Sequence, residues 1–321
     1  MKKGILLLLF ICNLMTVSTF AQIRYVKVGG TGNGSSWANA SGSIQDMIDY
    51  TFSGGEVWVG EGTYNLSATL QMKEGVDVYG GFFGDETSIA DRPKSDLDNN
   101  GTVEPWEYTH VTVLNGQNIV QVVNQATDFS VETTWDGVTI TNGKNTTGEG
   151  GGASIKANCI LTNAVISNNS VNGSNTRGGC VYNSGGTIRN CIISNNTSSA
   201  IGNGGNSDIY SYGGGVYNLG GAVSNCVISN NTASSVGVFS NINYTYGGGI
   251  YNSGIISNCT ISNNTVYLTG PSSQSKLYGG GICNANTSVL VRNCIVSNNT
   301  PAGYLSLITY GGGIYQGTID S

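Results

Sequence analysis

Tyr212-Gly-Gly-Gly-Val-Tyr-Asn218, followed by Val223-Ser-Asn-Cys-Val-Ile-Ser-Asn-Asn-Thr232, is the stretch that decides the fold. The same two segments recur with almost no change at 246–265 and at 278–300. An earlier copy spans 178–197, and another begins at Tyr310. Repetition of this kind is typical of a solenoid, in which every copy stacks on the next one.

Each copy has the pattern of strands rather than of helices. Apolar and polar residues alternate, as in Cys259-Thr-Ile-Ser-Asn, while glycine triplets and asparagine pairs mark bends. We expect three short strands per copy, about eight stacked coils, and polar inserts that vary freely between copies. Residues at one repeat position should form a single inward column; they are Val138, Ala164, Cys191, Cys226, Cys259 and Cys294.

The two ends of the chain differ from the repeats. Residues 1–21 are expected to be a secretory signal peptide, because two lysines precede a short apolar run and a small-residue cleavage site. Residues 22–321 should then form one domain, with a cap and the first coils in 22–144 and the Gly/Asn/Cys-rich repeats in 145–321. An amphipathic helix near Ser43–Tyr50 would cap the first coil. The last copy stops before its second segment, so we expect a C-terminal truncation.

The pattern Gly-Gly-[Ile/Val]-Tyr-Asn…Asn-Cys-x-Ile-x-Asn-Asn resembles the pectate-lyase-like superfamily, in particular secreted bacterial members. It is also similar to the repeats of polymorphic outer-membrane adhesins. The resemblance covers nearly all of 22–321 and implies an all-β, right-handed parallel β-helix that is secreted or held on the outer cell surface. It implies little about activity, because this scaffold carries lyases, hydrolases and pure binding proteins.

The charge of the chain limits its partners. Loss of Lys2 and Lys3 with the leader leaves 11 basic and 19 acidic residues, a net charge of −8. This charge argues against nucleic acid and anionic membranes as partners, and we expect no membrane span after residue 21. Only Glu149, Asp208 and Asp320 among the acids lie beyond residue 144, so the repeats are nearly uncharged. We expect a monomer.

Residues 96–107 fit the EF-hand loop template and predict a Ca²⁺ site. Gly101 permits the tight turn, while Pro93 and Pro105 argue against the paired helices of a calcium sensor. Calcium would therefore clamp a long insertion; the alternative is an acidic surface loop that matches by chance. The expected ligands are the side chains of Asp96, Asp98, Asn100 and Glu107, the backbone carbonyl of Thr102, and Glu104 directly or through a water.

No catalytic residues are predicted. A lyase on this fold needs carboxylates for calcium and an Arg or Lys base, and a glycoside hydrolase needs two carboxylates. The three acids of the repeats are far apart in sequence, and His110 is the single histidine. Acids of the N-terminal half, Asp77 and Asp136 among them, could still meet in space. A polysaccharide lyase or a glycoside hydrolase therefore stays open as the alternative.

Tyrosines recur at two repeat positions and predict two ladders. The simpler interpretation is self-stacking that fixes the register; the other is a platform for sugar rings, whose apolar faces stack on aromatic side chains. We predict a non-catalytic, adhesin-like protein that binds a polysaccharide or a cell-surface glycoprotein. The first ladder, offered as the glycan-binding set, is Tyr212, Tyr246, Tyr278 and Tyr310, and the second is Tyr182, Tyr217, Tyr251 and Tyr315. The seven cysteines after residue 21 are expected to be free thiols that pack as small apolar residues.

Overall fold

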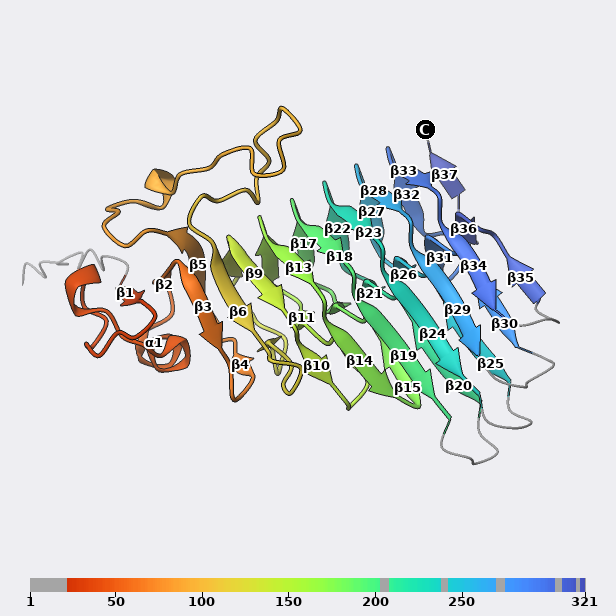
Figure 1. Ribbon diagram of the computed structural model, residues 1–321, viewed down its shortest axis with the longest axis horizontal. Coiled ribbons are helices and arrows are strands. Elements are labelled where there is room, and N and C mark those ends of the chain that lie inside the picture. Colours follow the sequence, from red (N-terminus) through yellow and green to blue (C-terminus); the bar gives the residue numbers. More distant parts are fainter. Residues whose placement is uncertain are drawn as a thin grey trace, which may run out of the picture.

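The computed structural model describes residues 22–202, 208–237, 242–269, 275–303, 308–315 and 318–320. Short strands stack coil upon coil along one axis, as Figure 1 shows. Strands of successive coils pair in parallel and in register, for example Val216 with Val181 on one side and Ile250 on the other. The predicted parallel β-helix is therefore confirmed. The leader 1–21 lies outside the described residues.

Three sheets enclose the core. Sheet 1 contains, in order, β1 (Ile23–Val26), β2 (Gly55–Gly60), β5 (Val76–Phe82), β8 (Thr133–Asp136), β12 (Cys159–Thr162), β17 (Thr187–Arg189), β22 (Ala222–Ser224), β27 (Ile255–Ser257), β32 (Leu290–Arg292) and β37 (Thr318–Asp320). Sheet 2 contains β3 (Gly62–Asn65), β6 (Thr112–Asn115), β9 (Val138–Thr141), β13 (Val165–Ser167), β18 (Ile192–Ser194), β23 (Val227–Ser229), β28 (Thr260–Ser262) and β33 (Ile295–Ser297). Sheet 3 contains β4 (Leu70–Gln71), β7 (Val123–Asn124), β11 (Ala153–Lys156), β16 (Val181–Ser184), β21 (Val216–Leu219), β26 (Ile250–Asn252), β31 (Ile282–Asn284) and β36 (Ile314–Tyr315).

The inserts between the repeated segments form two further sheets. The prediction of three strands per coil was therefore too low. Sheet 4 contains β10 (Lys144–Asn145), β14 (Ser170–Gly173), β19 (Thr197–Ile201), β24 (Thr232–Val236), β29 (Thr265–Thr269) and β34 (Thr300–Gly303). Sheet 5 contains β15 (Asn175–Arg177), β20 (Ile209–Tyr212), β25 (Asn243–Tyr246), β30 (Lys276–Tyr278) and β35 (Ile308–Tyr310). Hydroxyl groups bond across the two sheets, as between Ser235 and Thr245 at 2.7 Å. Small hydroxyl side chains thus take several of the inward positions in these sheets, beside a small apolar cluster of Ala233, Val266, Leu268 and Leu277.

One coil shows how the repeat fills the interior. Val216, Val223, Cys226 and Ile228 point inward and are buried. The predicted inward column forms, with buried side chains from Val138 to Cys259 and a half-buried one at Cys294. All seven described cysteines are free thiols. The backbones of adjacent coils approach closely at the glycine triplets: a Cβ atom on Gly214 would lie 2.2 Å from the carbonyl oxygen of Gly248.

The two asparagines of each Ser-Asn-Asn-Thr segment have different roles. The first, such as Asn230 with φ 56°, takes the left-handed conformation that asparagine tolerates and turns the chain. The second is buried and bonds to its equivalent in the next coil: Asn196 Nδ2 donates to Asn231 Oδ1 at 2.9 Å, and Asn231 Nδ2 to Asn264 Oδ1 at 3.0 Å. These bonds form a buried asparagine ladder along the axis. A second buried ladder comprises Asn183, Asn218, Asn252 and Asn284.

The predicted capping helix is α1 (Ile44–Tyr50). The hydroxyl of Ser43 caps it by accepting a hydrogen bond from the Asp46 amide, and Ile44, Met47 and Ile48 are buried against the first coil. Two short 3-10 turns, η1 (Trp37–Asn39) and η2 (Ile89–Asp91), complete the described helices. Within the described part of the chain, no helix is both long and apolar enough to cross a bilayer.

Candidate calcium site and tyrosine face

The segment between β5 and β6, residues 83–111, leaves the stack as a long insertion that Figure 1 shows projecting from the N-terminal coils. Arg92 fastens it to the coils: its Nη1 lies 2.7 Å from Asp136 Oδ1 on β8 and donates to the Gly80 carbonyl at 2.8 Å. The Tyr108 hydroxyl donates to the same carboxylate oxygen at 3.0 Å, and the Arg92 guanidinium packs 4.7 Å from the Tyr108 ring centroid. The insertion therefore has a fixed base. Sequence reasoning missed this ion pair.

At the tip of the insertion, the loop 96–107 gathers three carboxylates. One oxygen each from Asp96, Asp98 and Glu107 lies within 4.8 Å of the other two. Backbone amides aim these groups inward: the Gly101 amide donates to Asp96 at 2.8 Å, and the Leu97 amide to Glu107 at 2.8 Å. Gly101 has φ +90°, which a residue with a side chain rarely adopts. Three hard oxygen donors around one tight turn would supply part of the roughly six to eight oxygens that Ca²⁺ takes.

The other three expected ligands lie beside this cluster. Asn100 Nδ2 donates to Asp98 Oδ2 and to Glu104 Oε1, both at 3.0 Å, so the amide group bridges two carboxylates. Rotation of that amide by half a turn would present its oxygen to a cation. The Thr102 amide donates to Asn100 Oδ1 at 2.9 Å. All six residues thus belong to one compact loop, and its donor set of carboxylate, amide and carbonyl oxygens suits calcium.

The carboxylates of the loop influence one another. Hydrogen bonds from the backbone amides of Glu104, Leu97 and Asp98 hold the pKa of Glu107 below its usual value. The hydrogen bond from Asn100 also lowers the pKa of Glu104, but burial and the neighbouring carboxylates of Glu107 and Asp98 outweigh it and raise this pKa. A bound cation would reduce the electrostatic repulsion between these carboxylates.

The tyrosine face is the outer surface of sheets 3 and 5. On sheet 5, the rings of Tyr212, Tyr246, Tyr278 and Tyr310 stack with centroids 4.9, 4.8 and 5.0 Å apart and planes within 8°. On sheet 3, Tyr182, Tyr217 and Tyr251 stack at 5.4 and 5.1 Å. The two ladders meet edge to face, as between Tyr212 and Tyr251 at 4.9 Å and 72°. Both predicted ladders therefore form, although the second has Cys283 in place of a ring before Tyr315.

The stacking decides which part of each ring can meet a ligand. Faces inside a ladder are covered by the neighbouring rings, so a sugar cannot lie flat on them. The hydroxyl groups remain available: none of the described residues hydrogen-bonds to those of Tyr212, Tyr246 or Tyr278. Burial, followed by the proximity of other tyrosines, raises the pKa of Tyr278 to about 12, so its hydroxyl keeps its proton at neutral pH. The face offers a row of neutral hydroxyls, each able to donate and accept.

Comparisons with known proteins add little to this geometry. No model of a protein family matches the chain, and no curated protein matches it. Among solved structures, the crystal structure of a pectin methylesterase from Aspergillus niger aligns with 94% of this chain and 87% of that chain, at 14% identity and a TM-score of 0.37. A likeness this distant says nothing about activity.

Acids on neighbouring strands of sheet 1 are the candidates for a catalytic pair: Glu56 on β2 lies directly opposite Asp77, and Asp136 lies on the strand beyond it. Asp77 on β5 accepts hydrogen bonds from the Thr134 amide at 2.6 Å and the Tyr79 hydroxyl at 3.3 Å, and burial raises its pKa. Asp136 lies on the neighbouring strand β8, opposite Tyr79. Since Asp77 and Tyr79 are two residues apart on one strand face, Asp77 and Asp136 are diagonal neighbours. Asp136, however, is 6% exposed and already bound by Arg92, Tyr108 and Asn163.

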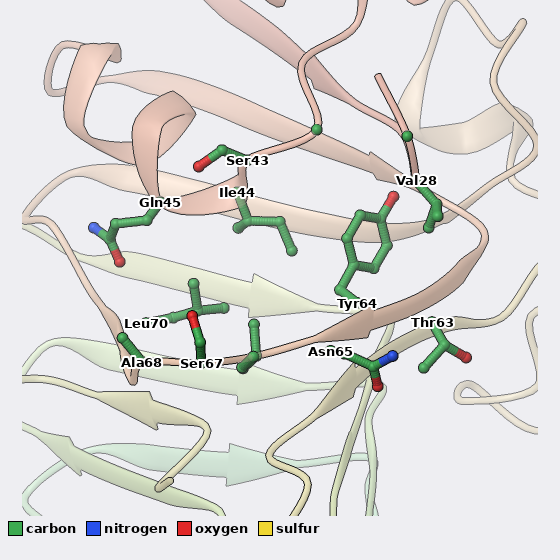
Figure 2. A pocket seen from close by; sticks show the side chains of 13 residues that line it. Val28, Ser43, Ile44, Gln45, Thr63, Tyr64, Asn65, Ser67, Ala68 and Leu70 are labelled. Atoms are coloured by element: carbon green, nitrogen blue, oxygen red, sulfur yellow. The ribbon is translucent and has the colours of Figure 1, made fainter. Parts of the chain in front are cut away.

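A hollow of about 420 Å³ lies between α1 and the loop after β3. Figure 2 shows Ile44 on one side of it and Tyr64 on the other. The Tyr64 hydroxyl donates to the Gly60 carbonyl at 3.0 Å, and Gln45 exchanges hydrogen bonds with the backbone of Gln71 at 2.7 and 3.3 Å. None of its lining residues is charged, so this hollow is the seam between cap and first coil and brings no carboxylates together.

Proposed function

We propose that the protein is an exported, calcium-stabilised β-helix that binds a neutral polysaccharide or cell-surface glycoprotein glycan along its tyrosine face, without turning it over. The observation that carries the proposal is the row of hydroxyls on sheet 5, repeated on the successive strands β20, β25, β30 and β35. A polymer of sugars repeats its own hydroxyls along its length, so successive coils can exchange hydrogen bonds with successive sugar units. Contacts are then made through ring edges and hydroxyls rather than through ring faces.

The charges around the face agree with a neutral ligand. Arg177, at one end of the first ladder, already pairs with Glu149 at 3.0 Å. Lys276 lies 5.9 Å from the ring centroid of Tyr244, beside the ladder rather than within it. An acidic polysaccharide would need several unpaired cations along its path, and the face does not offer them.

The calcium loop and the leader support an extracellular setting. Extracellular calcium modules bind the ion with dissociation constants of about 10⁻⁴ to 10⁻³ M, which suits an exposed loop of this kind. The signal peptide expected at 1–21 would deliver the chain to that environment. Calcium acts in this proposal as a structural clamp on the insertion.

A glycan array probed in the presence of calcium tests the proposal. We expect binding to neutral glycans that weakens in Tyr246→Phe, which keeps the stacked ring and removes one hydroxyl. Tyr50→Phe, on exposed α1 at the far end of the molecule, is the matched control and should bind as the wild type does. Equal binding by wild type and Tyr246→Phe would show that the hydroxyl row is not the contact.

A glycoside hydrolase is the second candidate, favoured by one observation. Asp77 and Asp136 are diagonal neighbours on adjacent strands, and inverting glycosidases use two carboxyl groups about 6.5–9.5 Å apart as acid and base. The raised pKa of Asp77 would suit a general acid. Assays for new reducing ends and for unsaturated products across polysaccharides test this reading and the lyase reading together. If the wild type cleaves a polysaccharide and Asp77→Asn does not, the protein is a hydrolase and the binding proposal is wrong.

A further inference from the structure

One position of the second tyrosine ladder lacks its ring. In sheet 3, Tyr182, Tyr217, Tyr251, Cys283 and Tyr315 are successive partners in register. Cys283 lies between inward-pointing Ile282 and Asn284, so its side chain faces outward where the other coils carry a phenol. The thiol fills only a small part of that space.

The missing ring leaves a hollow of about 180 Å³. It is lined by Tyr246, Tyr251, Tyr278, Cys283, Asn284, Ala285 and Tyr315. Cys283 is 2% exposed and forms the floor, while four tyrosine rings form the walls. The neighbouring coils have not closed over the gap, because their spacing is held by the continuous backbone pairing and by the asparagine ladder beneath it.

Tyr246, Tyr251 and Tyr278 have the arrangement that surrounds a ring elsewhere in the face. Tyr315, by contrast, is tilted by 54° relative to Tyr278 and by 51° relative to Tyr310. Tyr251 and Tyr315 are two ladder steps apart, about 10 Å at the spacing of 5.1 Å seen between Tyr217 and Tyr251. Tyr251 itself stands edge to face with Tyr212 at 4.9 Å and with Tyr246 at 6.0 Å. Tyr251 thus contacts one tyrosine of its own coil and one of the preceding coil. The equivalent neighbours of a ring above Cys283 would be Tyr278 and Tyr246. This position is also a break within the second ladder, where Tyr251 has Cys283 rather than a ring as its next partner.

We propose that this hollow, the Cys283 slot, binds a single flat aromatic ring, and that a 4-hydroxyphenyl group fits it best. The proposal goes beyond glycan binding and does not depend on it. An aryl ring in the slot would stack on Tyr251 and present its edge to Tyr246 and Tyr278, which are the two favoured geometries of aromatic pairs, with Tyr315 as the remaining wall. A hydroxyl in the para position would reach solvent beside the hydroxyls of the neighbouring rings. A pyranose is thicker than an aryl ring and carries equatorial hydroxyls that the ring walls cannot bond.

Binding of p-cresol, measured by saturation-transfer NMR and calorimetry on the full chain, tests the proposal. We expect saturable binding at about millimolar concentration, the range for a ligand of so few atoms. Cys283→Tyr supplies the ring covalently, so p-cresol affinity should fall at least about tenfold while the melting temperature is kept or raised. Cys283→Ala keeps the slot open and should bind p-cresol as the wild type does.

Further ligands and variants test whether the slot recognises the flat ring itself. 4-Methylcyclohexanol has the size of p-cresol without its flat ring and should bind more weakly; equal binding would mean an unspecific apolar hollow and would overturn the proposal. Equal p-cresol binding by Cys283→Tyr, or none by the wild type, would also overturn it.

Tyr246→Phe keeps every ring wall, so aryl binding should survive this variant even though glycan binding weakens. N-acetyl-tyrosinamide distinguishes the source of the ring: tighter binding than p-cresol would indicate a peptide tyrosine, and weaker binding a small free phenol.

Discussion

Arg92 Nη1 lies 2.7 Å from Asp136 Oδ1, and this buried ion pair joins the calcium-loop insertion to strand β8 of the stack. The rings of Tyr79, Phe82 and Tyr108 surround the guanidinium at 4.7 to 5.5 Å from its central carbon. The carboxylate also accepts hydrogen bonds from Tyr108 and Asn163. Both charged groups therefore have further partners besides each other, as burial of opposite charges requires.

Removal of one charge from this pair should destabilise the protein strongly. Asp136→Asn leaves the Arg92 guanidinium buried without a counter-charge, and breaking a buried pair costs about 3–5 kcal/mol. The matched control is Arg177→Gln, which breaks the half-exposed pair with Glu149 and should cost no more than about 1 kcal/mol. Chemical denaturation of both variants checks the difference. Similar losses in the two would mean that the Arg92–Asp136 pair is no more important than a surface pair.

Calcium should raise the melting temperature. A ligand at 100 times its dissociation constant stabilises the folded state by about 2.7 kcal/mol, which amounts to a rise of several degrees. Asp98→Asn removes one charge of the Asp96, Asp98, Glu107 cluster and should abolish most of that rise. Asp85→Asn removes an exposed charge of the same insertion outside the loop and serves as control. A melting curve that excess calcium and chelator leave unchanged would refute the calcium site.

The two asparagines of one Ser-Asn-Asn-Thr segment should respond differently to substitution. In Asn231→Leu, the backbone and side-chain donors of Asn196 lose the oxygen they share. Each buried donor left without an acceptor costs about 1–3 kcal/mol, so we expect a loss of about 2–6 kcal/mol. Asn230→Gly should be nearly neutral, because glycine adopts the same positive φ without strain. The urea unfolding midpoints of the two variants, measured side by side, test this difference. Equal losses of stability would contradict a turn role for Asn230 and a ladder role for Asn231.

Alkaline pH should unfold the repeats as the tyrosines ionise. Burial, followed by the proximity of other tyrosines, raises the pKa of Tyr251 and of Tyr278 from 10.0 to about 12. Because the folded-state pKa is the higher one, the stabilisation is fully present below pH 10 and is lost as the pH rises towards 12. Tyrosinate absorbance and circular dichroism should therefore change together in that window. Ionisation of these tyrosines near pH 10 in a still folded protein would contradict the buried ladders.

The repeats predicted the core of the fold because one local pattern recurs and every copy constrains the others. The same pattern could not reveal sheets 4 and 5, whose strands mix buried hydroxyl residues such as Ser198 and Ser211 with a few buried apolar residues such as Leu268. The carboxylate cluster of the loop 96–107 was predictable because its members lie within twelve residues of one another. The pairing of Arg92 with Asp136 was not, because 44 residues separate them and no repeat relates them. Cys283 was visible as an exception in its column, but the hollow above it depends on neighbours that keep their spacing.

The asparagine ladder formed by the second asparagine of each Ser-Asn-Asn segment, from Asn169 to Asn299, has a direction. The Oδ1 atoms of Asn196, Asn231, Asn264 and Asn299 each accept the backbone and side-chain donors of the asparagine in the preceding coil, beginning with Asn169. The amide dipoles therefore align and polarise one another along the axis. The two ends of such a chain are chemically unlike, since one terminates in acceptors and the other in donors. Coils of this type can be joined only head to tail. In a coil grafted in reverse orientation, the asparagine Nδ2 donor would face the Nδ2 donor of the preceding coil, and no hydrogen bond would form between them.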